Sequence, residues 1–129
     1  MKPVLHGAGT CEHRNLRTFE PEHPESVHLV LQIDVGPPGQ KGSTSFTVRV
    51  VTPKGLATLP APKRIIASGK LLVLARYDYD VVWRWVEQTV GKCEAHSWSG
   101  CVELLRRKFD WELEGYRDYR SRYIRGSGA

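Results

Sequence analysis

The 129-residue sequence has no long apolar segment, and we expect that it carries no export signal of its own. Its longest uninterrupted apolar run, residues 71–75, is far shorter than the roughly 20 residues that a helix needs to cross a bilayer. The first ten residues also lack the apolar stretch of a secretory signal. We therefore expect a cytoplasmic protein with no association with membranes.

Cysteine is scarce, and the three thiols, Cys11, Cys93 and Cys101, are an odd number. Without an export signal, this count favours reduced thiols over a disulfide framework. Cys93, His96 and Cys101 are of the types that bind zinc, but they supply three ligands where a structural site needs four. We expect no metal.

Motifs of catalysis and of nucleotide binding are also missing. No glycine-rich phosphate loop is present, and no pattern typical of a nucleophilic thiol surrounds any of the cysteines. The sequence therefore predicts neither a cofactor nor an enzyme.

Charge is unevenly distributed along the chain. Lysine and arginine outnumber the acidic residues by 19 to 14, and much of the excess lies near the C-terminus. Residues 116–125 interleave arginines with tyrosines, which can stack on bases and neutralise phosphates. A small nucleic-acid-binding domain that uses this tail is the alternative function, although the rest of the chain contains no known nucleic-acid-binding module.

Alternation of apolar and polar residues predicts the strands. Residues 27–35 and 46–52 show this period of two and are expected to form a hairpin with a long loop. Residues 71–76 are apolar on both faces, which is typical of a central strand covered on both sides. Residues 110–116 alternate again, and residues 2–5 are a candidate N-terminal strand.

Helical spacing of apolar residues predicts two helices. The first covers residues 79–90 after a capping Asp78, and the second starts after Ser97 and keeps one apolar face as far as Phe109. These elements predict an α+β fold, in which two helices pack against a mostly antiparallel sheet of about four or five strands.

The chain is long enough for one domain, which we place at residues 1–125. A basic tail is expected from about residue 117. Residues 126–129, with the sequence Gly-Ser-Gly-Ala, are typical of a flexible end or of a vector-derived remnant.

Three carboxylates, Asp110, Glu112 and Glu114, would lie on one face of the last strand, about 6 to 7 Å apart. This spacing suits acid and base catalysis, but a solvated strand face is the commoner meaning. The third interpretation is an acidic patch that meets a basic partner. Trp83 flanks the apolar side of its helix, where an indole serves either as core or as an interface anchor.

Several short segments in a fixed order resemble the Immunity protein 8 family of bacterial polymorphic toxin systems. A helix start at Ser97-Trp98 accompanies them shortly before the last segment. The segments are PEHPE at residues 21–25, VGP at residues 35–37, FTVRVVTPK at residues 46–54, YDY at residues 77–79 and FDWELEGYR at residues 109–117.

The resemblance implies a cytosolic, non-enzymatic α+β protein that binds and neutralises a toxin encoded beside it. It provides no residue-level map of the binding face. As anchors of such an interface we predict a tryptophan, three carboxylates and two arginines. Whether the chain forms a homodimer through the wide apolar face of the first helix is left open. The predicted anchors are Trp83, Asp110, Glu112, Glu114, Arg117 and Arg120.

Overall fold

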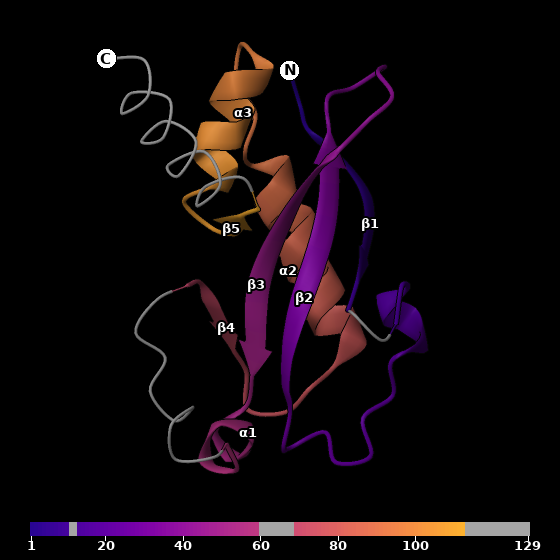
Figure 1. Ribbon diagram of the computed structural model, residues 1–129, viewed down its shortest axis with the longest axis vertical. Coiled ribbons are helices and arrows are strands. Elements are labelled where there is room, and N and C mark those ends of the chain that lie inside the picture. Colours follow the sequence, from indigo (N-terminus) through magenta and orange to yellow (C-terminus); the bar gives the residue numbers. More distant parts are fainter. Residues whose placement is uncertain (11–12, 60–68, 113–129) are drawn as a thin grey trace, which may run out of the picture.

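A computed structural model describes residues 1–10, 13–59 and 69–112 of the chain (Figure 1). It contains a five-stranded sheet in the order β1-β2-β3-β4, in which β5 also pairs with β3. The strands are β1 (Val4–Gly9), β2 (His28–Gly36), β3 (Thr44–Val51), β4 (Leu71–Val73) and β5 (Asp110–Trp111). Only the pairing of β3 with β4 is parallel among these strands, so the predicted α+β fold with a mostly antiparallel sheet is confirmed.

The hairpin of β2 and β3 forms the centre of the sheet. Its register runs from His28 opposite Val51 to Val35 opposite Thr44, which confirms the predicted pairing. One face of the hairpin is buried because every second residue is aliphatic or aromatic. Its inward side chains, each at most 1% exposed, are Leu31, Ile33, Val35, Phe46, Val48 and Val50.

The predicted central strand at residues 71–76 is wrong. β4 covers only Leu71–Val73 and, within the described residues, pairs with β3 alone. Leu72 packs against the core, whereas Leu71 and Val73 are 43% and 55% exposed. An apolar run has the same pattern whether its second face is covered or open, so the sequence could not distinguish the two cases. The N-terminal strand, in turn, lies at Val4–Gly9 and not at residues 2–5.

Two longer helices, α2 (Tyr79–Gly91) and α3 (Trp98–Leu105), cover the buried face of the sheet. The predicted caps are present: Asp78 accepts the backbone N–H groups of the first turn of α2, and Ser97 accepts that of Gly100. α3 ends earlier than expected, but Phe109 is still fully buried and lies edge-on to Trp85, with ring centroids 5.5 Å apart.

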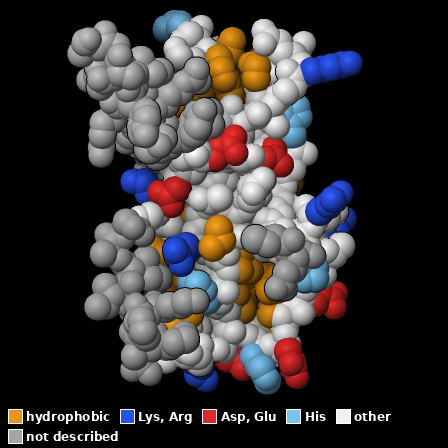
Figure 2. Space-filling model, viewed as in Figure 1, with side chains coloured by type: hydrophobic (Ala, Val, Ile, Leu, Met, Phe, Trp, Pro, Cys, Tyr) orange, Lys and Arg blue, Asp and Glu red, His pale blue; other side chains and the backbone are white. Residues whose placement is uncertain are grey.

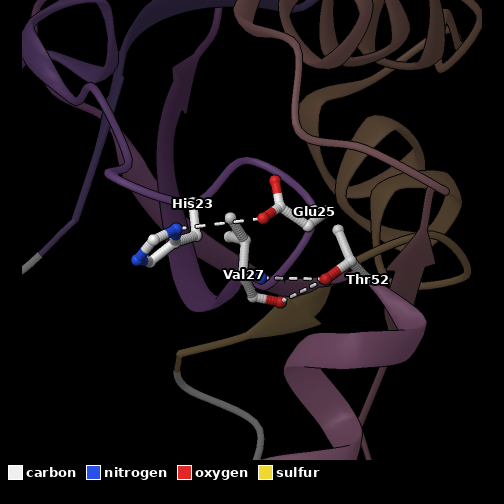
Figure 3. A network of polar contacts seen from close by, with 4 residues as sticks. All are labelled: His23, Glu25, Val27 and Thr52. Atoms are coloured by element: carbon white, nitrogen blue, oxygen red, sulfur yellow. Dashed lines mark hydrogen bonds and ion pairs between the residues drawn. The ribbon is translucent and has the colours of Figure 1, made fainter.

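The short helix α1 (Pro53–Ala57) follows β3 directly and starts at a capping Thr52. Figure 3 shows the Thr52 hydroxyl between the backbone N–H and C=O groups of Val27. Gly55 is required here, because a Cβ atom would collide with the Val27 carbonyl oxygen. The end of β3 is therefore tied to the residue that precedes β2.

Both layers are seen in Figure 1, where α2 passes behind β2 and β3. The face of the sheet turned toward the viewer is thus the face away from α2. A turn of 3-10 helix (Leu16–Thr18) lies in the connection between β1 and β2. In the ranges that the structure describes, no helix is long and apolar enough to span a membrane.

Candidate protein-binding surface

Two of the predicted anchors, Asp110 and Glu112, lie at the β5 end of the sheet. An oxygen of the Asp110 carboxylate accepts the backbone N–H of Lys70 at 2.9 Å. The Glu112 carboxylate accepts the backbone N–H of Ser45 at 3.0 Å. Both side chains therefore hold neighbouring strands in place, and Glu112 is also exposed to solvent.

Trp83 lies elsewhere, on α2. It is half-buried and stacks on Tyr79, with ring centroids 6.2 Å apart and an angle of 13° between the ring planes. Together with Pro3 and Leu5 it lines a hollow of about 320 Å³ beside β1. Because β1 and β5 flank opposite sides of the β2–β3 hairpin, the structure does not bring Trp83 together with the acidic pair.

Three other predicted anchors, Glu114, Arg117 and Arg120, lie outside the described residues. The same holds for the arginine and tyrosine tail on which the alternative of nucleic-acid binding rests. These assignments stay predictions.

The outward-facing side chains of β2, β3, β4 and β5 form a surface that we call the open face. Register places Val30, Arg49 and Leu71 side by side in one row across three strands. The next row contains His28, Val51 and Val73, of which Val51 is fully buried and Val73 is exposed. Val30 and Leu71 are 41% and 43% exposed, so aliphatic side chains contact water on both sides of Arg49.

We call this part of the open face the apolar end; it consists of His28, Val30, Arg49, Leu71 and Val73. Within it, the Arg49 guanidinium lies 3.4 Å from Nε2 of His28 on the neighbouring strand. That nitrogen accepts a hydrogen bond from Arg49 when it carries no proton of its own. No carboxylate forms an ion pair with Arg49 within the described part of the chain.

The other part of the open face is acidic. Asp34 accepts a hydrogen bond from the Ser45 hydroxyl at 2.7 Å, and Asp110 shares a row with Thr47 and Gln32. We call Asp34, Asp110 and Glu112 the acidic end. In Figure 2, apolar side chains lie in the lower half of the view beside basic ones and histidine, with a further apolar group near the top, and acidic side chains lie near the middle and again at the lower right edge.

Sequence reasoning overlooked the apolar end. The signal was present in Val30, which is an apolar residue on the strand face otherwise made of His28, Gln32 and Asp34. Leu71 and Val73 were assigned to a covered strand, so their exposure was not expected.

The thiols of Cys93 and Cys101 are free and buried. Cys93 donates a hydrogen bond to the carbonyl oxygen of Thr89 at 3.2 Å, and burial raises the pKa of its thiol. A raised pKa disfavours the thiolate, which is the reactive form. Across the described residues, no cluster of three or more histidine, cysteine or acidic side chains could hold a metal ion.

Comparison with protein families decides the identity. A family model described as Immunity protein 8 matches residues 4–116, which include all five strands and both longer helices. The chain belongs to the Immunity protein 8 family. Membership confirms the resemblance seen in the sequence and implies an immunity protein against toxins. No curated protein matches the chain, and no solved structure does.

In this Immunity protein 8 member, a hollow of about 500 Å³ adjoins the apolar end. His28 and Val30 form part of its lining, and Phe19 and Pro21 line it from the connection between β1 and β2. The surface at the apolar end is therefore hollowed, and a partner can insert a side chain there.

Proposed function

We propose that this chain binds and neutralises a cognate secreted toxin in the bacterial cytoplasm by covering the toxin's surface. The observation that carries the proposal is the match of the Immunity protein 8 model over residues 4–116. Neutralisation by occlusion needs a rigid surface and no reaction centre.

The structure supports this mode of action physically. The sheet is held from one side by α2 and α3, so its outward side chains keep fixed positions without a partner. A stable protein interface buries about 800 Å² on each partner, and nanomolar binding corresponds to about −12 kcal/mol. A few desolvated anchors supply most of such an affinity.

The predicted anchors fall into separate regions under this proposal. Asp110 and Glu112 border the open face and can belong to one interface with it. Trp83, on the helical layer beside β1, would need a toxin that wraps around that edge. Glu114, Arg117 and Arg120 complete the proposed set.

Co-expression tests the function. The product of the neighbouring open reading frame is expressed in cells with and without this chain. We expect survival only with this chain, together with co-purification of the two proteins. A frameshifted copy of the gene is the control. Failure of both rescue and co-purification would overturn the proposal.

A further inference from the structure

We infer that the open face, centred on Arg49, is the surface that receives the toxin, and that the toxin places there an apolar patch with a carboxylate aimed at Arg49. This inference rests on the proposed function and names the surface through which that function acts.

Exposed aliphatic surface is concentrated at the apolar end. Six large apolar side chains are exposed in the described residues, namely Met1, Val4, Val30, Leu71, Val73 and Val81. Three of the six belong to the apolar end: Leu71 and Val73 lie on β4, and Val30 lies on β2, two strand spacings or about 10 Å away across β3. Because exposed apolar surface costs free energy in water, three such side chains in neighbouring rows around Arg49 are typical of an interaction site.

Arg49 defines the chemistry of the partner. It is half-buried beside Val30 and Leu71, and among the described residues its guanidinium contacts Nε2 of His28. A partner that covers these aliphatic neighbours also removes water from the guanidinium, which is costly unless an anion replaces the water. A carboxylate does so best, since it accepts two parallel hydrogen bonds from the guanidinium.

A second copy of this chain fits the open face poorly. A two-fold axis parallel to the strands would place the Arg49 guanidinium groups of the two copies against each other. An axis across the strands would place the apolar end of one copy against the acidic end of the other. The first arrangement opposes two like charges. The second gives Arg49 a carboxylate but sets Val30, Leu71 and Val73 against acidic and polar side chains, whereas a toxin is free to supply complementary groups for both.

The size of the face shows that the contact extends further. Four strands of eight residues span roughly 400 Å² as a flat area, from about 4.8 Å between strands and 3.3 Å per residue. A standard interface takes about 800 Å² from each partner. The toxin must therefore also cover a flank, and the acidic end, Asp34 with Asp110 and Glu112, selects basic groups on it.

Two valines with equal exposure provide a matched test. Val73 at the apolar end and Val81 on α2 are both 55% exposed. The dissociation constant of the purified toxin complex is measured for wild type, Val73→Glu and Val81→Glu. We expect Val73→Glu to weaken binding about 100-fold or more, as for an anchor residue. Val81→Glu should change it less than about 3-fold, since isolated surface changes have small effects.

The charge is tested in the same way. Arg49→Gln should weaken binding about 10-fold or more, as for loss of an interface arginine, whereas Arg84→Gln on the exposed side of α2 should leave it unchanged. Replacing the toxin's matching carboxylate by lysine should restore binding to Arg49→Glu. Thermal midpoints verify folding, and Leu71→Glu replaces Val73→Glu if the latter is unstable.

The outcomes separate the two proposals. If wild type binds the toxin and Val73→Glu and Arg49→Gln bind equally well, the surface assignment is overturned while the function stands. If wild type does not bind, the function itself fails. A wild-type dimer in sedimentation that Val73→Glu dissociates would assign the open face to a second copy and overturn the inference.

Discussion

The hydroxyl of Thr52 accepts the backbone N–H of Val27 at 2.8 Å and is completely shielded from solvent. The same oxygen accepts the backbone N–H of Gly55 at 3.1 Å, so one buried atom joins the start of β2 to the first turn of α1. The exposed pair of His23 and Glu25, whose Nδ1 and Oε1 atoms lie 3.8 Å apart, is also drawn in Figure 3 and contributes little by comparison. Thr52 thus fixes the end of the β2–β3 pairing at His28 and Val51, next to the apolar end.

Thr52→Val should destabilise the protein, because it leaves two buried N–H groups without an acceptor while preserving the shape of the side chain. We expect a loss of about 2 to 4 kcal/mol in the free energy of unfolding. Chemical denaturation measures it, and Thr52→Ser is the matched control, since serine keeps the oxygen. Equal stability of the valine and serine variants would contradict the role of the hydroxyl.

Tyr77 should make stability depend on alkaline pH. Its hydroxyl is buried without a hydrogen-bond partner among the described residues, and burial, aided by Tyr79 and Asp78, raises its pKa to about 12 from 10.0. The folded state thus holds the proton longer than the unfolded state. The contribution of Tyr77 to the free energy of unfolding is fully present below pH 10 and falls by about 3 kcal/mol between pH 10 and 12.

Tyr77→Phe tests this linkage. The variant should be as stable as wild type at neutral pH, or more stable by about 1 kcal/mol, because a hydroxyl without a partner is removed. It should also lose the part of the decline above pH 10 that wild type shows. An identical alkaline decline in both proteins would show that Tyr77 ionises normally.

The sequence predicted the elements correctly where a local pattern is compatible with only one arrangement. Alternation over residues 27–35 required one buried face, and the Asp78 and Ser97 caps marked the two helix starts. The prediction for residues 71–76 was wrong because periodicity shows which residues are apolar but not whether another element covers them. Only the register with β3 shows that Leu71 and Val73 stand on the open face.

The candidate site was harder to predict than the fold. Asp110 and Glu112 were recognised as a charged strand face, but their bonds to the backbone of Lys70 and Ser45 join residues far apart in the sequence. The row that joins Val30 to Arg49 and Leu71 also depends on long-range pairing. No spacing along one strand contains that information.

The buried thiols should be unreactive in the folded protein. Cys93 and Cys101 are 4% and 0% exposed, and burial raises the pKa of Cys93. In a Cys11→Ser background, we expect neither thiol to react with a disulfide reagent at neutral pH until denaturant is added. Rapid reaction of one thiol in the folded protein would contradict the described packing.

Asp110 allows the structural and binding roles of its carboxylate to be separated. Asp110→Ala should cost about 1 to 2 kcal/mol of stability, because the Lys70 N–H loses its acceptor. Asp110→Asn keeps an acceptor oxygen and should leave the thermal midpoint nearly unchanged. If the acidic end meets basic groups of the toxin, the asparagine variant should still bind more weakly and with less dependence on salt.

A titration of toxin activity with the purified chain tests neutralisation by binding most directly. We expect activity to fall linearly and to vanish at one chain per toxin, with full recovery when the complex is dissociated. Loss of activity at substoichiometric amounts, or loss that persists after the chain is removed, would show chemical inactivation of the toxin and contradict occlusion.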